Sequence, residues 1–339
     1  MTTQSKTYVT TTTFEALAAR INESKKITVT THRKPDGDAI GSVVALYRAL
    51  HSIGKDVEVL IVGPLEHGLA IVAGDTPIRM VENEGVPTED PDLVIVVDTG
   101  AWSQLEAIEP WLRERPACIV GIDHHSNGDD VAADRIVDVT AAATTQVVME
   151  LFDVMGIDLG SGGGCIAEAL FVGIATDTGW FRFSNADARC FADASTLLQH
   201  DLNRYDIYRS LEETARPARM ALLQRMLGSL EIINNVAVMV LRSTDFDETK
   251  GKSTDLVGLV NTPMVIEGVQ ASILLTDSNP GITKLSFRSK PPLLEDPSSL
   301  IDVNQLAGNF GGGGHVHAAG ARVKEPLEAV KARLLEHLL

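Results

Sequence analysis

The sequence predicts an α/β protein with an N-terminal parallel sheet carrying helices on both faces, a helical connector, and a smaller C-terminal α/β domain. Apolar strand-like runs alternate with helical patterns through the first half of the 339 residues, as they do in parallel sheets. From about 187 to 230 the pattern becomes helical and more charged, and shorter strands resume beyond it. Domains usually have about 100–200 residues. The predicted boundaries are therefore 1–190, 191–230 for the connector, and 231–339.

The sheet of the first domain is predicted to begin with a strand at 27–31, followed by a helix at 40–50. That helix carries most of its apolar residues on one face, and Gly54 suits its C-terminal end. Leu93–Val97 is wholly apolar, which is typical of a parallel strand buried on both faces. The remaining predicted elements are strands at 57–62 and 118–122 and helices at about 142–155 and 165–176.

The second domain is predicted to contain strands near 236–242, 269–276 and 283–288, a glycine-rich turn at 311–314 and a helix from about 326 to 338. The start of the chain lacks the apolar core of a signal peptide, so we expect a frayed tail there, next to a threonine run at 10–13. No stretch of about 18 uncharged apolar residues predicts a transmembrane helix. We therefore expect a cytoplasmic protein.

Composition argues against two classes of protein. The net charge of −17 lacks the basic excess with which proteins grip long nucleic acids, so a nucleic-acid substrate should be short and held by a few local cations. The alternative is that this charge serves solubility only. The cysteines Cys118, Cys165 and Cys190 form no Cys-x-x-Cys pair. They favour plain burial over a zinc knuckle or a disulfide framework.

Acidic and histidine residues follow four apolar segments of the first domain. They are His32, Asp36 and Asp38 after the first strand, Asp98 after 93–97, the triplet Asp123-His124-His125 after 118–122, and Asp177 after 166–174. In open parallel sheets, the edge formed by the C-terminal ends of the strands is where ligands bind. We therefore expect these side chains to form one site.

Each group also has a purely structural interpretation. Asp38 could cap the helix that it opens, Asp36 could lie in a tight turn, and Asp177 could lie in an exposed C-terminal turn. A structural Asp98 is harder to justify, because burying an unpaired carboxylate is costly. Adjacent histidines point in different directions from an extended backbone, so one could bind a metal while the other reaches a substrate.

Taken together, the four groups offer aspartate oxygens and imidazole nitrogens without a thiolate. Such a set suits Mn²⁺ or Mg²⁺ better than structural zinc. Six ligands are enough for two ions that share a bridging carboxylate, and two ions about 3.5–4 Å apart activate a water and stabilise a phosphoryl group during transfer. The sequence therefore predicts a centre of two Mn²⁺ or Mg²⁺ ions.

A glycine-rich segment of the second domain is a further candidate site. Four consecutive glycines, 311–314, lose much chain entropy on ordering, and they suit a place where backbone N–H groups approach a phosphate. His315 and Arg288 could add charge, since arginine matches phosphate with a planar fork. The alternative is a flexible surface loop. A Walker loop is excluded, because the Gly-Lys-Ser/Thr ending is missing.

The combined motifs resemble those of the DHH phosphoesterase superfamily. His32-x-x-x-Asp36-x-Asp38, Asp98, the Asp123 triplet and Asp177 resemble its four motifs. Phe287-Arg-Ser-Lys290 and the segment from Phe310 to Gly320 resemble the C-terminal nucleotide-binding domain of one branch, so the resemblance spans about 27 to 323. Size and layout are similar to the bifunctional oligoribonucleases of that family, which also dephosphorylate 3′-phosphoadenosine 5′-phosphate.

The resemblance implies roles for individual residues. One metal ion would be bound by His32, Asp36 and Asp98, and the other by Asp38, Asp98, His124 and Asp177, with Asp98 bridging. His125 would lie beside the substrate phosphate, so His125 and Asp98 are the expected catalytic residues. The substrate-binding residues that it implies are Arg288, Ser289, Gly312, Gly313, Gly314 and His315.

These observations predict a two-metal phosphoesterase acting on short RNA, with release of 5′-mononucleotides, and on 3′-phosphoadenosine 5′-phosphate. Two alternatives stay open: a phosphodiesterase of linear or cyclic dinucleotide signals, and a non-catalytic nucleotide sensor. The expected partners are short RNA or DNA oligonucleotides or small nucleotides, with no membrane and no long nucleic acid. A homodimer is an open alternative for the assembly.

Overall fold

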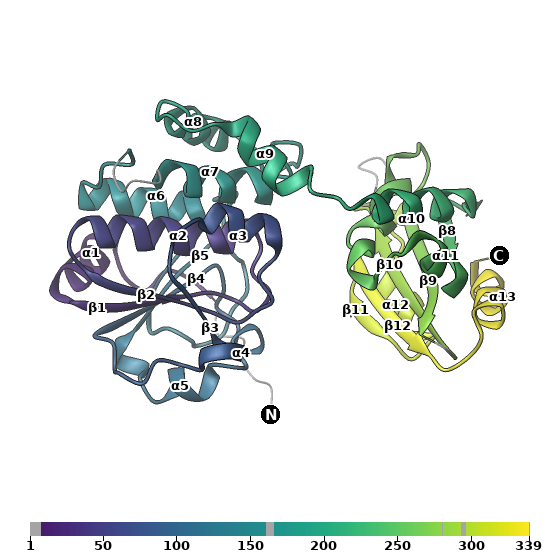
Figure 1. Cartoon of the computed structure of the whole chain (residues 1–339), viewed down its shortest axis with the longest axis horizontal. Helices are drawn as coiled ribbons and strands as arrows, with labels where there is room; N and C mark the ends of the chain where they lie inside the picture. The colour runs from purple at the N-terminus through teal and green to yellow at the C-terminus, as the bar shows by residue number, and fades with distance from the viewer. Residues whose placement is uncertain (1–7, 161–165, 280, 293–295, 339) are drawn as a thin grey trace. The chain divides into compact units, whose positions relative to one another are not determined.

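The computed structural model describes residues 8–160, 166–279, 281–292 and 296–338. The chain divides into two compact units, Met1–Thr214 and Ala215–Leu339, and each has its own layers of strands and helices (Figure 1). Cys165 and the predicted tail before Tyr8 lie outside the described residues. Each unit is described by itself below.

The first unit contains six parallel strands in the order β3-β2-β1-β4-β5-β6. Their bounds are Lys26–Thr30 (β1), Asp56–Ile61 (β2), Ile78–Met80 (β3), Leu93–Val97 (β4), Ile119–Asp123 (β5) and Asp134–Val137 (β6). The chain builds outward from β1 to β3 and then returns to the other side of β1 with β4. The strand order therefore reverses between β1 and β4, and in open parallel sheets ligands bind outside the strand ends at such a point.

Helices cover both faces of this sheet, as predicted, but unequally (Figure 1). The face of the sheet with the larger apolar core packs against several helices. They are α1 (Phe14–Glu23), α2 (Gly37–Ser52), α3 (His67–Ala73), α6 (Thr144–Met155) and α7 (Ile166–Asp177). On the opposite face, the α-helices among the described residues are the short α4 (Val81–Glu84) and α5 (Glu109–Arg113). Most residues of α2 and α7 are buried, so these two helices lie at the centre of the larger apolar core.

The threonine run at 10–13 is ordered by contacts with β6 and α1. The Thr11 backbone N–H donates to the carbonyl of Arg135 at 2.9 Å, and the Thr10 hydroxyl donates to the carbonyl of Val137 at 2.8 Å. The Thr13 side chain accepts from the backbone N–H of Ala16 and so caps α1. Residues 8–13, here named the N-terminal arm, thus run along β6.

The segment predicted as a separate connector, 191–230, is divided between the two units. Its first part contains most of α8 (Ala188–Leu197) and α9 (Arg204–Glu212), which bury Leu197 and Ile207 in the core of the first unit. Its last part, α10 (Pro217–Gly228), buries Leu222 and Met226 in the second unit. Each of these amphipathic helices packs on its nearer unit, so the division falls at Thr214 and Ala215.

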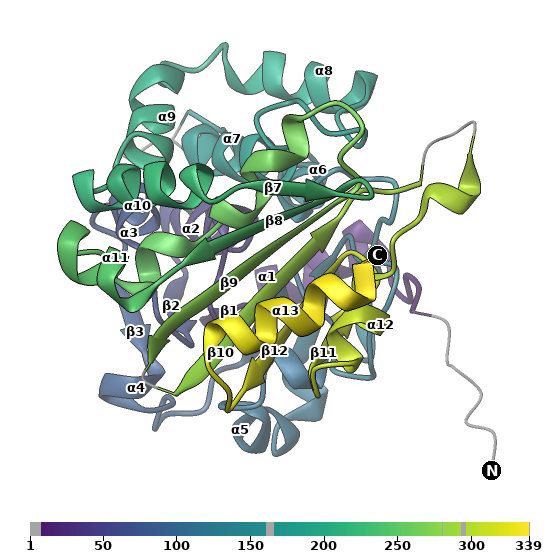
Figure 2. The same ribbon diagram turned by 90° about the vertical axis from the view of Figure 1, so that its right-hand side faces the viewer.

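The second unit has one mixed sheet in the order β11-β12-β10-β9-β8-β7, in which β8 and β9 are parallel and the other pairs antiparallel (Figure 2). The strands are Glu231–Ile233 (β7), Val236–Leu241 (β8), Ala271–Asn279 (β9), Ile282–Ser289 (β10), Gly313–His315 (β11) and Ala318–Val323 (β12). One face packs on α12 (Val303–Gly308) and α13 (Leu327–Leu338), and part of the other on α10 and α11 (Ser243–Thr249). Short 3₁₀ helices lie at Trp102–Gln104, Pro116–Cys118, Ser253–Leu256, Leu259–Val265 and Pro297–Ser299.

The strands and the last helix predicted for this unit are confirmed, but the interpretation of 311–314 as a turn is wrong in part. Gly313 and Gly314 belong to β11, an edge strand paired with β12. Glycine-rich sequence has low strand propensity, so local pattern favoured a turn, whereas pairing with β12 fixes a strand. Among the described helices, none combines the length and apolarity needed to cross a bilayer.

Candidate metal centre

The predicted metal ligands of the first unit converge outside the C-terminal ends of β1, β4 and β5. Two groups of side chains each bring their ligand atoms within 4.8 Å of one another: His32, Asp36 and Asp98 in one, and Asp38, His124 and Asp177 in the other. Asp98 also forms a group with His124 and His125. The strand-order reversal thus gathers residues that are far apart in the sequence.

Asp98 lies between these groups. One carboxylate oxygen, Oδ2, is 3.4 Å from Nε2 of His32, and the other, Oδ1, is 3.6 Å from Nε2 of His124. The residue is 3% exposed, and its backbone adopts a left-handed conformation with φ of 59°. Each oxygen of Asp98 therefore faces a histidine of a different group.

Backbone carbonyls fix the imidazole tautomers. Nδ1 of His32 lies 3.0 Å from the carbonyl oxygen of Arg33, and Nδ1 of His124 lies 3.1 Å from that of Ala141. A carbonyl oxygen only accepts, so Nδ1 carries the hydrogen in both rings. In both rings it is therefore Nε2 that faces the carboxylates, and Nε2 is the nitrogen that a cation among them would bind.

The start of α2 holds two of the carboxylates, although the roles expected for them are exchanged. Asp36, not Asp38, is the N-cap, and its Oδ1 accepts from the backbone N–H groups of Asp38 and Ala39 at 3.1 Å. Sequence reasoning placed the helix start two residues too late because Asp38 is also a good cap residue. The capping role expected for Asp38 thus belongs to Asp36, whose Oδ1 also lies 3.8 Å from Nε2 of His32.

Asp38 lies in the first turn of α2 and is 1% exposed. The N-terminal turn of α6 binds it: the backbone N–H groups of Thr144 and Thr145 donate to it at 2.6 and 3.0 Å, and the Thr145 hydroxyl donates at 2.9 Å. The Thr144 hydroxyl also donates to Asp98 at 2.9 Å. These threonines were missed, and a polar pair at a helix start is the one signal that points to them.

Crowding of the carboxylates shifts their proton affinities. Burial and the Asp38 carboxylate raise the pKa of Asp98 to about 7 and that of Asp177 to about 6. Burial lowers the pKa of His32, but hydrogen bonds to Asp36 and Asp98 outweigh this and raise that pKa to about 10. The centre therefore needs positive charge among its carboxylates, and a bound divalent cation would supply it in place of protons.

The two adjacent histidines point differently, as the sequence predicted. Their rings meet edge to face at 67°, with His124 largely buried and His125 half-exposed. Nδ1 of His125 lies 2.7 Å from Oδ1 of the buried Asp123, and this hydrogen bond raises the pKa of His125 to about 9. Nε2 of His125 is therefore left for a ligand outside the centre.

The predicted substrate-binding residues of the second unit lie on β10 and the β11–β12 hairpin. Arg288 and His315 are both in register with Ala318, from opposite sides, so they share one cross-strand row. This row lies on the face opposite α12 and α13, because the neighbouring Phe287 and Ala319 are buried in the core that those helices cover. The sheet thus places the backbones of Arg288 and His315 about 10 Å apart, twice the spacing of adjacent strands.

The glycines are explained in part by packing. A Cβ at Gly312 would overlap the carbonyl oxygen of Gly320, and one at Gly314 would overlap that of Ala318. Gly313 has more space, with Asn304 Oδ1 at 3.5 Å from its Cβ position. Ser289 directs its hydroxyl to the hairpin turn, 3.2 Å from the carbonyl oxygen of Val316. Gly312 and Gly314 are therefore required because the backbone of this segment lies so close to the backbone of β12 that a side chain would not fit.

Known proteins share this architecture and these motifs. Residues 26–174 match the N-terminal domain of the DHH family, and residues 233–338 match the DHHA1 domain. The bifunctional oligoribonuclease and PAP phosphatase NrnA of Thermus thermophilus is 30% identical over 91% of this chain and 88% of its own length. The cyclic-di-AMP phosphodiesterase PdeA of Listeria monocytogenes is 27% identical over 92% of this chain and 47% of its own length.

A solved structure supports the same relationship. The crystal structure of an exopolyphosphatase-related protein from Bacteroides fragilis superposes with a TM-score of 0.82 at 25% identity, covering 96% of this chain and 94% of that one. The family matches fall on both units, and the Thermus relative aligns along nearly the whole chain. This protein therefore belongs to the DHH family of phosphoesterases, in the branch that carries a DHHA1 domain.

Proposed function

We propose that this chain hydrolyses phosphate esters of short oligonucleotides, releasing 5′-mononucleotides, and of 3′-phosphoadenosine 5′-phosphate, with two Mn²⁺ or Mg²⁺ ions. The observation that carries the proposal is Asp98, whose two oxygens face two separate groups of ligands. One cation would be held by His32, Asp36 and Asp98, and the other by Asp38, Asp98, His124 and Asp177. Bound there, the cations would supply a nucleophilic water and neutralise charge on the phosphoryl group.

The protein's own residues divide the remaining work. Thr144 and Thr145 hold Asp98 and Asp38 in place, so that the carboxylates need not reorganise during the reaction. His125, whose Nδ1 is engaged by Asp123, donates from Nε2 to the substrate phosphate. Arg288, His315 and the backbone N–H groups of Gly312–Gly314 hold the terminal phosphate of the nucleotide on the second unit, while Ser289 supports the hairpin.

The relatives favour short substrates. The Thermus relative that aligns along nearly this whole chain is an oligoribonuclease and PAP phosphatase. The net charge of −17 also opposes association with a long polyanion, since like charges slow encounter and weaken binding. We place the reaction in the cytoplasm, where short RNA and 3′-phosphoadenosine 5′-phosphate would be its substrates. A homodimer stays an alternative for the assembly.

One alternative function has support of its own. The Listeria relative, whose match covers 92% of this chain and 47% of its own length, is a cyclic-di-AMP phosphodiesterase. The same centre would serve a linear or cyclic dinucleotide, because the reacting phosphodiester is chemically alike. A non-catalytic nucleotide sensor is disfavoured, since all six candidate ligands are kept and gathered.

A substrate panel with Mn²⁺ distinguishes these functions. It compares a dinucleotide, a five-nucleotide RNA, an RNA of roughly fifty nucleotides, a cyclic dinucleotide and 3′-phosphoadenosine 5′-phosphate. We expect kcat/KM for the short RNAs to exceed that for the long RNA by on the order of tenfold or more. Equal values for the short and long RNAs would contradict the proposal. Fastest turnover of the cyclic dinucleotide would favour the signalling alternative, and binding without turnover would favour a sensor.

A further inference from the structure

The N-terminal arm reaches the histidine that we place beside the substrate. Tyr8 is 7% exposed, and its hydroxyl donates a hydrogen bond of 2.9 Å to Oδ2 of Asp123, although the two residues are 115 positions apart. Oδ1 of the same carboxylate lies 2.7 Å from Nδ1 of His125. Two consecutive hydrogen bonds therefore connect Tyr8 to His125.

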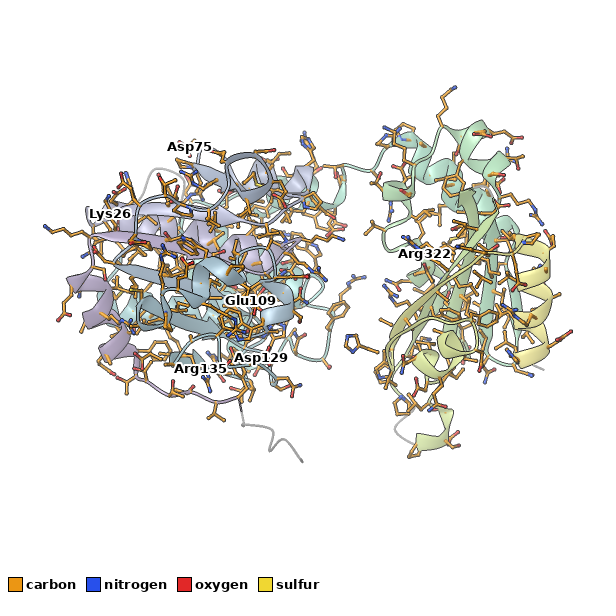
Figure 3. The ribbon with its side chains drawn as sticks, turned by 90° about the horizontal axis from the view of Figure 1, so that it is seen from below. Lys26, Asp75, Glu109, Asp129, Arg135 and Arg322 are labelled. Carbon is orange, nitrogen blue, oxygen red and sulfur yellow. The ribbon has the colours of Figure 1, made fainter. Side chains whose placement is uncertain are left out.

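The first unit contains a slot shaped for the Tyr8 ring. A Cβ at Gly100 would overlap the Tyr8 hydroxyl, and a Cβ at Gly128 would lie 2.5 Å from a ring carbon. The guanidinium of Arg135, labelled in Figure 3, lies over the ring at 5.0 Å from its centre. Two glycines from separate loops thus leave the space that this side chain fills.

Hydrogen bonds to β6 hold the N-terminal arm in place, and they fix the position of the Tyr8 ring as well. Thr11 donates its backbone N–H to the carbonyl of Arg135, and Thr10 both donates to and accepts from the backbone of Val137. Burial and the Asp123 carboxylate raise the pKa of Tyr8 far above its ordinary value. The hydroxyl therefore remains a hydrogen-bond donor.

The two oxygens of Asp123 have different partners. Oδ1 accepts from the backbone N–H groups of His124 and His125 and from the His125 ring, while Oδ2 accepts from Tyr8. Asp123 is fully buried. In the part of the chain that the structure describes, Tyr8 is thus the donor to Oδ2, and without its hydroxyl this buried oxygen would lose its partner and the carboxylate would turn toward other donors.

We propose that Tyr8 is a positioning residue, which orients the His125 ring through Asp123 and makes the N-terminal arm part of the hydrolytic site. The inference rests on the proposed role of His125 in hydrolysis. It adds to that function a residue outside the two family domains, since the match to the DHH family begins at residue 26.

The first test is Tyr8→Phe, which removes the hydroxyl while the ring still fills the slot. We expect kcat on a dinucleotide to fall about tenfold, with KM and Mn²⁺ affinity changed by less than about twofold, as for outer hydrogen-bond partners of catalytic groups. The matched control is Tyr47→Phe, which removes a hydroxyl from the ring that stacks on His51 in α2; it should leave kcat unchanged. An unchanged kcat in Tyr8→Phe would overturn the proposal. So would a lower kcat that is accompanied by an equally large rise in KM and an equally large loss of Mn²⁺ affinity.

A double-mutant cycle tests the route through Asp123. In an Asp123→Asn background, adding Tyr8→Phe should lower kcat by less than about twofold, because the two residues act through one hydrogen bond. Full additivity would contradict that route.

A spectroscopic readout keeps this inference separate from the proposed function. In ¹H–¹⁵N spectra of the histidine rings, Tyr8→Phe should shift the Nδ1 resonance of His125 and leave those of His51 and His67 in place. If the wild-type protein failed to hydrolyse a dinucleotide, the proposed function would fail, but this spectrum would still decide whether Tyr8 positions His125. An unmoved His125 resonance would refute the positioning role.

Discussion

Asp98 is the residue on which the metal centre depends most directly. Asp98→Asn keeps the size of the side chain, and asparagine accepts the left-handed backbone that aspartate adopts here. The substitution removes a charge and replaces one of the two oxygens that face His32 and His124. We expect kcat to fall on the order of a thousandfold, because both cations would lose a shared ligand.

Calorimetric titration with Mn²⁺ checks this prediction, and the bound stoichiometry should drop in Asp98→Asn. The control is Asp75→Asn, because Asp75 is exposed and far in sequence from every ligand (Figure 3). Near-normal turnover by Asp98→Asn would exclude a shared ligand between two cations.

Arg288 offers the opposite outcome. Its side chain is half-buried, and the one hydrogen bond that its guanidinium makes among the described residues is to the carbonyl of Phe287. Arg288→Ala should raise KM by roughly tenfold or more and lower kcat less, because a bidentate phosphate contact is lost while the metal ligands remain.

The same titration with Mn²⁺ should give unchanged affinity for Arg288→Ala. Arg225→Ala, which breaks an exposed pair with Glu248 in the same unit, is the matched control and should leave KM unchanged. If Arg288→Ala bound Mn²⁺ as weakly as Asp98→Asn, strand β10, which carries Arg288, would have to belong to the metal centre.

At the scale of elements, the close packing of α2, α6 and α7 places Asp38. A Cβ at Gly173 would lie 2.5 Å from Oδ1 of Asp38 and would overlap the side chain of Thr145. Gly173→Ala should therefore lower the free energy of unfolding by about 1–3 kcal/mol through overpacking. It should also weaken Mn²⁺ binding, because the carboxylate must move.

Urea unfolding and Mn²⁺ titration measure these two effects. The matched control is Gly228→Ala at the end of α10, where a Cβ meets nothing within 4 Å. It should leave Mn²⁺ affinity unchanged and should not lower stability, since an unstrained Gly→Ala change restricts the unfolded chain. A Gly173→Ala protein as stable as the control would show that α7 can shift without cost.

The elements that sequence reasoning located are those whose signal is local. Leu93–Val97 is apolar throughout and was predicted at its observed bounds. The strands β3 and β6 were missed, because β3 is half-exposed and β6 begins with Asp134 and Arg135. Neither shows the apolar run of a buried strand.

The candidate ligands were found because the C-terminal ends of parallel strands share one edge. Their supports were not, because those contacts are remote in sequence. Thr145 contacts Asp38 across 107 positions, and Tyr8 contacts Asp123 across 115. No local pattern marks a threonine or a tyrosine as the partner of a distant carboxylate, and two of the four glycines of 311–314 are required by a strand pairing that the sequence does not display.

At the scale of the whole molecule, the apolar clusters are each confined to one unit. Differential scanning calorimetry should therefore show two unfolding transitions. The candidate ligands all lie in the first unit. Mn²⁺ should therefore raise the transition temperature of that unit alone, and the free energy of unfolding should rise by about 2.7 kcal/mol for each bound ion at a hundredfold excess over Kd.

The Asp98→Asn variant shows which transition belongs to the first unit. In this variant, Mn²⁺ should no longer shift the transition that it shifts in the wild-type protein. Chelation should return the wild-type protein to the profile seen without metal. A single transition, or a shift of both by Mn²⁺, would mean that the units unfold together.

The reversal of strand order between β1 and β4 also bears on how the protein is made. His32 leaves the ribosome early, but its partner Asp98 takes its place only after β2 and β3 have been added and β4 has returned to pair with β1. Asp177 follows later still, at the end of α7. A growing chain can thus complete the group of His32, Asp36 and Asp98 once β4 has paired, but the group that contains Asp177 only after α7 has been made. Binding of a second Mn²⁺ ion would therefore report that synthesis has passed α7, since a chain that is truncated before Asp177 lacks a ligand of the second group.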